Sequence, residues 1–181
     1  MKILVTGNPT FGLAAEIFKL YPDATFISRS NGYDLTTKEG FNKVEQIISN
    51  YDVFINCSAL WKFHQTLLLE SVYKKCVDLK HDILIICIGS TTDRVKKATS
   101  WLYNAEKKAI RDYANSLSLI GVWQGGPRVS LISFGSLSNV QKKHPDRTCL
   151  EISIAAKYIK WLIDQPKDIN INEISIDPVQ K

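Results

Sequence analysis

Residues 2–20 read KILVTGNPTFGLAAEIFKL and combine three local signals in one short stretch. The segment Lys2–Val5 is a brief apolar run, which is typical of a buried strand. It leads into Thr6-Gly7-Asn8-Pro9-Thr10, a run of turn-forming residues, after which apolar residues recur at helical spacing from Phe11 to Leu20. The stretch therefore predicts a strand, a glycine turn and a helix, in that order.

The same alternation continues through the rest of the chain. Five more strand-like apolar runs are expected at 24–28, 52–56, 82–88, 128–134 and about 169–176, and four more helices at 34–50, 65–79, 100–119 and 150–164. Continuously apolar strands that alternate with helices indicate a parallel sheet covered on both faces, wound by right-handed crossovers. We therefore predict an α/β fold: a doubly wound, Rossmann-type parallel sheet of about six strands in three α/β/α layers, forming one domain over residues 1–181.

Composition narrows the classes of partner. The net charge of +5 comes from dispersed basic pairs without a long basic tract or an aromatic-basic RNA motif, so no nucleic acid is expected. The four cysteines form no C-x-x-C pair, which favours reduced thiols and no metal site. No apolar run approaches the ~18 residues of a membrane span, and no signal peptide is recognisable, so a soluble, cytoplasmic protein without membrane contact is expected.

The glycine turn at Thr6-Gly7 and Gly12 is the first candidate ligand site. Backbone amides at such a turn, together with the dipole of the following helix, suit a pyrophosphate, although a turn without a ligand is the alternative. Arg29 follows the second expected strand, where an acidic residue would bind a ribose 2′-hydroxyl. An arginine suits a 2′-phosphate instead, which favours NADP over NAD, unless Arg29 is merely a surface residue.

Three residues near the middle of the chain form the second candidate site. Tyr103 and Lys107 lie four residues apart on an expected helix, so both side chains share one face, and Ser90 lies thirteen residues before Tyr103. By itself the Tyr/Lys spacing is common enough to arise by chance. The alternative interpretation is a helical tyrosine with a solvated lysine beside it. The chain order of all these signals gives the trio its weight.

The order TGNPTFGLA at 6–14, Asp34-Leu35, NCSA at 56–59, Ser90 and then Tyr103/Lys107 resembles the short-chain dehydrogenase/reductase family. The resemblance covers nearly the whole chain and implies NAD(P)-dependent interconversion of alcohols and carbonyls. It implies that Tyr103 is the general acid/base, and that Ser90 holds the substrate oxygen. It further implies that Lys107 lowers the pKa of the tyrosine and binds the nicotinamide ribose.

The resemblance also implies a set of cofactor-binding residues: Thr6, Gly7, Asn8, Phe11, Gly12, Arg29, Asp34, Asn56, Ser58, Ala59 and Lys107. Asp34 would contact the adenine edge, with a helix N-cap as its alternative role. Asn56 and Ala59 would border the cofactor while mainly stabilising the sheet. The family's catalytic asparagine has no clear match in this sequence, and counting back from Ser90 brings Gln65 near its position.

Several features differ from the family pattern. The glycine turn is one residue shorter and lacks its middle glycine, and the few residues between Arg29 and Asp34 leave no room for a helix and strand found in most relatives. The loop 136–148 is too short for a large lid, so the cleft would be open or completed by another subunit. The helix 100–119 presents Trp101, Leu102, Ile110 and Tyr113, and the resemblance implies a homodimer or homotetramer through it.

The sequence thus predicts an NADP(H)-dependent oxidoreductase that interconverts a small carbonyl compound and its alcohol by hydride transfer. A non-catalytic dinucleotide-binding regulator or scaffold on the same fold is the alternative, because fold does not fix function.

Overall fold

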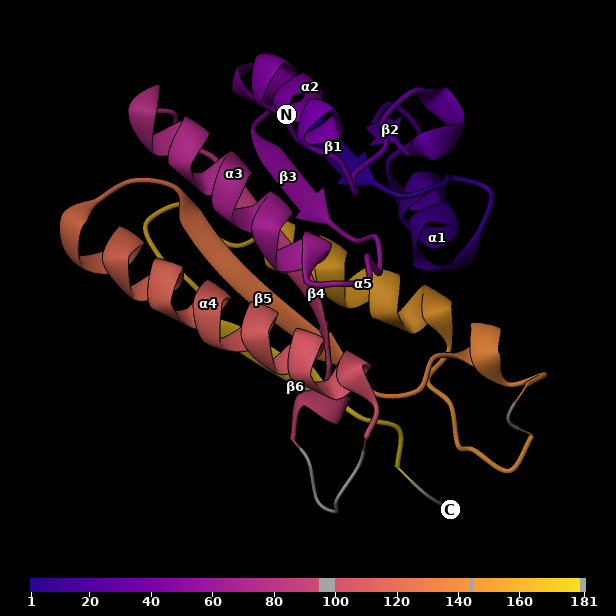
Figure 1. The fold of residues 1–181 in the computed structure, drawn as a ribbon. Helices are drawn as coiled ribbons and strands as arrows, with labels where there is room; N and C mark the ends of the chain where they lie inside the picture. Colours follow the sequence, from indigo (N-terminus) through magenta and orange to yellow (C-terminus); the bar gives the residue numbers. More distant parts are fainter. Residues whose placement is uncertain (95–99, 144, 180–181) are drawn as a thin grey trace.

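A computed structural model describes residues 1–94, 100–143 and 145–179, and its centre is one parallel sheet with strand order β2-β1-β3-β4-β5-β6 (Figure 1). Every neighbouring pair in the sheet is parallel. The strands are β1 (Ile3–Thr6), β2 (Thr25–Ile27), β3 (Val53–Asn56), β4 (Leu84–Ser90), β5 (Arg128–Phe134) and β6 (Glu173–Ile176). The predicted six-stranded α/β fold is confirmed.

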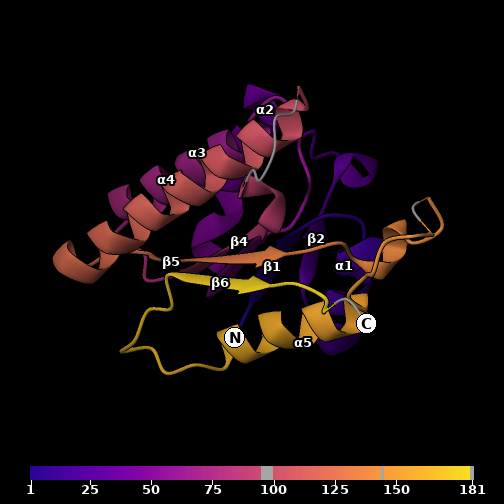
Figure 2. The same ribbon diagram turned by 90° about the horizontal axis from the view of Figure 1, so that it is seen from below.

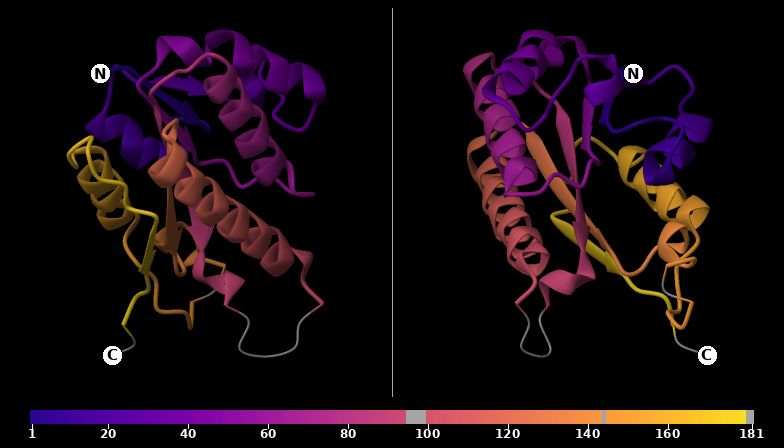
Figure 3. Two further views of the ribbon diagram at one scale, coloured as in Figure 1. Left: turned by 90° about the vertical axis from the view of Figure 1, so that its left-hand side faces the viewer. Right: turned by 45° about the vertical axis from the view of Figure 1, so that its right-hand side comes forward.

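Helices cover both faces of this sheet, which gives three layers (Figures 2 and 3). One face carries α1 (Gly12–Leu20) and α5 (Ile152–Ile163), and the other carries α2 (Lys38–Ile47), α3 (His64–Asp78) and α4 (Leu102–Gln124). Successive residues of each strand face opposite layers, so Leu4 and Phe54 pack beneath α3 while Val5 and Ile55 pack against α1 and α5. Two apolar cores therefore hold the sheet.

The connection between β2 and α2 is short and contains no further helix and strand, which limits the sheet to six strands. Ser28 and Asn31 form a capping box around the single 3-10 turn at 29–31, and Gly32 follows in the left-handed region at φ 89°. The chain then returns directly to α2, which leaves β2 at the edge of the sheet beside β1. The absence of a βα unit at this point is thereby confirmed.

Several expected boundaries were wrong by a few residues. The second helix begins at Lys38 rather than Asp34, because the Thr37 side chain accepts a hydrogen bond from the Gly40 N–H at 3.0 Å and acts as the N-cap. The long helix starts at Leu102 and continues past Leu119 to Gln124. The strand expected at 82–88 begins at Leu84 and continues to Ser90, and residues 95–99, before the long helix, lie outside the described residues.

The apolar residues of α4 divide between the core and the surface, where Leu102 is 54% exposed. Ile110 is only 1% exposed and Tyr113 packs against the core, so neither forms the free surface that the sequence suggested. Trp101 stacks on Tyr103 instead. Within the described ranges, none of the helices combines the length and apolar character that a membrane crossing requires.

Candidate active site

The carboxyl ends of the strands bring the two candidate sites to one edge of the sheet. Thr6 ends β1, Asn56 ends β3 and Ser90 ends β4, as expected for a doubly wound fold in which ligands bind beyond these ends. The N-terminal ends of α1 and α4 lie at the same edge (Figure 1). The sequence-predicted groups are therefore brought together from distant parts of the chain.

Ser90 is held at the end of β4 with 9% exposure. Its Oγ accepts a hydrogen bond from the Thr92 hydroxyl at 3.1 Å and a long one from the Thr92 N–H at 3.4 Å. Because both contacts use the serine oxygen as acceptor, its own hydroxyl proton can be donated to a neighbouring oxygen, either the Tyr103 phenol or a substrate oxygen. Ser90 can thus bind an oxygen on which negative charge develops.

Tyr103 lies half-buried between two indole rings. Its ring centroid is 5.6 Å from that of Trp61 and 4.8 Å from that of Trp101, on which it stacks. Burial raises the pKa of Tyr103, a hydrogen bond with Ser90 opposes the increase, and the charge of Glu106 adds to it. The phenol is therefore protonated at neutral pH and is placed beside the Ser90 hydroxyl.

The expectation that Lys107 lowers the pKa of Tyr103 was wrong for this arrangement. The Lys107 Nζ lies 5.5 Å from the centre of the tyrosine ring, but it donates to Gln65 Oε1 at 2.7 Å and to the Ile88 carbonyl at 3.1 Å. Burial lowers the pKa of Lys107 itself to about 8. An ammonium has three N–H donors, so one remains for a further partner.

Gln65 connects the lysine to the sheet. Its Nε2 donates to the carbonyl oxygens of Asn56 and Ile88, both at 3.0 Å, while the Asn56 side-chain amide donates to the Gln65 carbonyl at 2.9 Å. Gln65 is 4% exposed, and Asn56 is fully buried. The structure thus places Gln65 beside Lys107, and it gives the side chain of Asn56 a structural contact between β3 and α3.

The glycine turn presents backbone amides without a side-chain cap at the start of α1. Gly7 adopts φ 137°, and a Cβ on it would lie 3.0 Å from the Ala14 Cβ, so only glycine fits at this close approach. The N-cap Phe11 makes no side-chain capping bond, and the first turn of α1 contains no acidic residue. The first amides of α1 are therefore uncapped by a side chain, which fits the pyrophosphate of a dinucleotide.

Other residues expected at the turn have different contacts. The Thr6 hydroxyl accepts from the backbone amides of Cys57 and Ser58, both at 2.9 Å, and so joins β1 to β3. The Asn8 side chain accepts from the Thr10 N–H at 2.9 Å and from its hydroxyl at 2.7 Å, which shapes the turn. These contacts use the side-chain oxygens as acceptors, so the exposed Asn8 keeps both Nδ2 donors for a ligand, whereas Thr6 is fully buried.

Two further contacts border the turn. The Ser58 Oγ would lie 3.8 Å from a Cβ on Gly7, and the Asn139 amide 3.7 Å from a Cβ on Gly12. Asn139 belongs to the loop after β5, which therefore reaches the start of α1 despite its short length. Ala59 is exposed beside this region.

Arg29 and Asp34 form an ion pair at the end of β2. The Arg29 Nε lies 3.4 Å from Asp34 Oδ2, and the arginine side chain is 76% exposed. The other carboxylate oxygen of Asp34 accepts from the Thr36 hydroxyl at 2.6 Å and from its N–H at 3.1 Å, and these bonds hold the pKa of Asp34 below its ordinary value. Asp34 thus caps a local turn, not the helix, and Arg29 extends into solvent.

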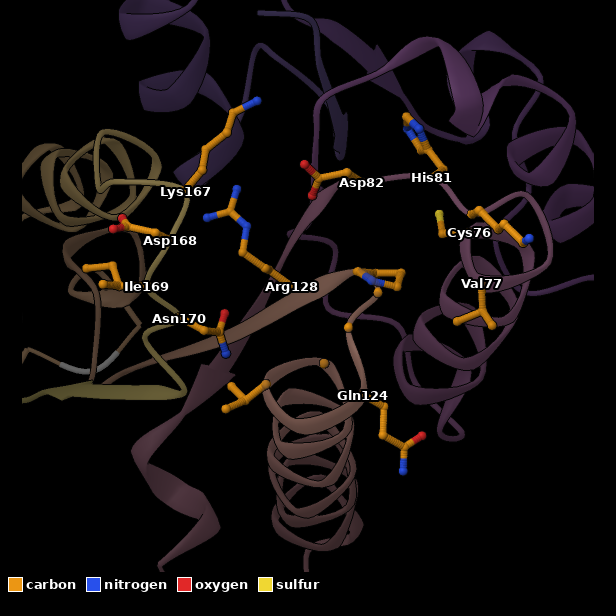
Figure 4. A pocket seen from close by; sticks show the side chains of 16 residues that line it. Cys76, Val77, His81, Asp82, Gln124, Arg128, Lys167, Asp168, Ile169 and Asn170 are labelled. Atoms are coloured by element: carbon orange, nitrogen blue, oxygen red, sulfur yellow. The ribbon is translucent and has the colours of Figure 1, made fainter.

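A separate cavity of about 710 Å³ lies at the opposite, amino-terminal end of the strands (Figure 4). Its walls include Val77 beside the end of α3, Gln124 at the end of α4, Arg128 at the start of β5, and the loop 167–170. Helix C-termini carry the negative end of the dipole, while the side chains of Lys80, Arg128 and Lys167 bring positive charge to the same cavity. Among the described residues, no group of His, Cys, Asp or Glu side chains could hold a metal ion.

Several solved structures have a similar fold, although their sequences differ greatly from this one. No protein-family model and no curated protein sequence matches the chain. Among solved structures, a closed form of serine dehydrogenase complexed with NADP+ has a TM-score of 0.75 and 16% identity over 97% of this chain and 94% of that one. A 4-hydroxyisoleucine dehydrogenase complexed with NADH has a TM-score of 0.73 and 18% identity, covering 98% and 97%.

A third similar structure is a short-chain dehydrogenase from Burkholderia cenocepacia in complex with NADP, with a TM-score of 0.77 and 13% identity over 96% of this chain and 86% of that chain. Identities this low establish the fold alone. The resemblance found in the sequence is confirmed at that level: the chain has the Rossmann-type α/β fold of the short-chain dehydrogenases/reductases.

Proposed function

We propose that this protein is an NADP(H)-dependent oxidoreductase that interconverts a small carbonyl compound and its alcohol. The observation that supports this most directly is the convergence of Ser90, Tyr103 and Lys107 at the carboxyl end of β4. The similar structures described as bound to NADP+ or NADH support a nicotinamide dinucleotide. When bound, the dinucleotide supplies a hydride to the carbonyl carbon or accepts one from the alcohol carbon.

The protein's own residues bind the substrate oxygen, transfer the proton and bind the ribose. The Ser90 hydroxyl donates to the substrate oxygen, and Tyr103 transfers its phenolic proton to that oxygen as negative charge develops there. The raised pKa keeps Tyr103 protonated at neutral pH, which favours carbonyl reduction, since alcohol oxidation needs the phenolate as base. Lys107, held by Gln65 and the Ile88 carbonyl, has one donor left for a ribose hydroxyl.

The phosphates would be held by backbone amides at the turn between Gly7 and Gly12. Arg29, with the Ser28 and Ser30 hydroxyls beside it, would bind a 2′-phosphate of NADP. Asp34 would contribute only through the carboxylate oxygen that faces Arg29, because its other oxygen accepts from Thr36.

Arg29→Ala should weaken NADPH binding by at least about tenfold, because a charge-assisted hydrogen bond contributes about 1.5–3 kcal/mol. The affinity for NADH, which has no 2′-phosphate, should stay the same. Titration followed by nucleotide fluorescence measures both constants. Arg128→Ala, at the far end of the sheet, is the matched control, and equal weakening of NADPH and NADH by Arg29→Ala would remove the preference for NADP.

A non-catalytic dinucleotide-binding role is the second candidate, and the short glycine turn, the missing family asparagine and the short loop 136–148 favour it. Tight NADPH binding without turnover across a broad panel of carbonyl compounds would support this candidate.

We also propose that the protein forms a homodimer or homotetramer. The exposed side chains near the end of α4, Leu119, Ile120, Val122 and Trp123, support it, and light scattering of the purified protein tests it.

A further inference from the structure

The rim of the Tyr103 site is aromatic on two sides. Trp61 comes from the loop before α3 and is 55% exposed, whereas Trp101 precedes α4 and is 50% exposed. Each indole rests against the Tyr103 ring and leaves about half of its own surface to solvent. Trp101 stacks on the tyrosine ring, whereas Trp61 meets it at a tilt of 54°, so the rim beside the phenol is largely aromatic.

The backbone that presents Trp61 is strained and firmly held. Lys62 and Phe63 adopt φ 58° and 62°, in the left-handed region that side chains other than glycine rarely occupy. The Lys62 N–H donates to Glu106 Oε1 at 2.5 Å, and the Trp61 carbonyl contacts His64 Nδ1 at 2.6 Å. Glu106 is 6% exposed on α4, so this contact fixes the loop to the helix that bears Tyr103.

The space on the inner side of this loop is already filled. The cavity between Trp61, Phe63, Tyr103 and Lys107 has a volume of only about 10 Å³, roughly that of one water. A substrate therefore does not fit in this cavity, and at the rim it would meet the half-exposed indoles. The nearby arginines do not supply a free cation there, since Arg94 and Arg111 both bind Glu173.

We infer that the substrate is an aromatic carbonyl compound or its alcohol, whose planar ring packs against the edge of Trp61 or Trp101 while its oxygen reaches Tyr103 and Ser90. This inference rests on the proposed function and names the substrate class of the same site. Stacked aromatic pairs favour planar rings over saturated rings of equal size. An aliphatic substrate would gain no such stacking from the indoles, although the exposed Lys62 beside Trp61 could still meet a carboxylate.

The test compares two aldehydes of similar size, benzaldehyde and cyclohexanecarbaldehyde, with NADPH as cofactor. The value of kcat/KM for benzaldehyde should exceed that for the saturated aldehyde by about tenfold. Trp61→Ala and Trp101→Ala should together remove this ratio, while Trp61→Phe should keep most of it. Trp123→Ala, an 80% exposed tryptophan at the other end of α4, is the control and should leave the ratio unchanged.

A binding measurement separates this inference from the proposed function. Titration with benzamide in the presence of NADP+ should quench tryptophan fluorescence in the native protein and less in Trp61→Ala. Saturable quenching without turnover of any aldehyde would support the aromatic site and remove the catalytic function. Equal kcat/KM for both aldehydes, or a preference for L-serine over benzyl alcohol in the oxidation direction, would overturn the inference while the catalytic function stands.

Discussion

Tyr103→Phe should lose turnover by about 10²–10⁴-fold, because general acid catalysis contributes an acceleration of that size. The substitution removes only the phenolic hydroxyl, whose described partner is Ser90, and keeps the ring between Trp61 and Trp101. Binding of NADPH should remain as in the native protein. Turnover is measured as NADPH consumption at 340 nm, with whichever of benzaldehyde and cyclohexanecarbaldehyde has the higher kcat/KM in the native protein.

Tyr158→Phe provides a matched control for this result, since Tyr158 lies 42% exposed on α5, on the other side of the sheet. Its turnover should equal that of the native protein. Thermal unfolding of Tyr103→Phe should show little change, because losing one hydrogen bond costs only about 1 kcal/mol. Undiminished turnover by Tyr103→Phe would show that another group donates the proton.

Lys107→Met should change the pH dependence of stability more than any other single substitution at the site. Burial lowers the pKa of Lys107 from 10.5 to about 8 in the folded protein. The unfolded chain therefore holds a proton that the folded protein releases between these two values, so native stability should rise as pH increases from about 8 to 10.5. Since a tenfold change in proton affinity corresponds to about 1.4 kcal/mol, the increase contributed by Lys107 is about 3 kcal/mol.

Urea unfolding of the native protein and of Lys107→Met at pH 7.5 and pH 10 measures this contribution as the difference between the two proteins. Lys107→Met also removes the hydrogen bonds that Lys107 makes to Gln65 and to the Ile88 carbonyl. This loss lowers the free energy of unfolding equally at both pH values, so it cancels when the two pH values are compared. Lys108→Met, in which a 60% exposed lysine is replaced, should show no such change between the two pH values. A pH-independent difference for Lys107→Met would mean that the buried ammonium is well solvated.

The order of the elements could be predicted from the sequence because buried parallel strands are continuous apolar runs. Such runs are distinct in this chain, and the strand 128–134 was located to the residue. Helix boundaries that depend on side-chain hydrogen bonds were harder to predict from the sequence. The sequence around Asp34 and Thr37 offers two good N-cap residues, and only the packing of Gly40 against the Asp34 carbonyl, where a Cβ would lie at 1.9 Å, selects Thr37.

The candidate site was predictable in its members but not in its electrostatics. The spacing of Ser90, Tyr103 and Lys107 identified the trio, because helical periodicity fixes which side chains share a face. The raised pKa of Tyr103 depends on burial between two tryptophans from separate loops, which no local pattern encodes. The partnership of Gln65 with Lys107 likewise spans 42 residues, and only the chain position of Gln65 hinted at it.

The lengths of the strands across the sheet have a consequence for solubility. The central strands β4 and β5 have seven residues each, whereas the edge strands β2 and β6 have three and four. An edge strand exposes unpaired backbone groups on which another chain can assemble, and a short edge offers few of them. The most β-prone segments of this protein are thus enclosed in the middle of the sheet, and its folded form should resist edge-to-edge aggregation even at high concentration.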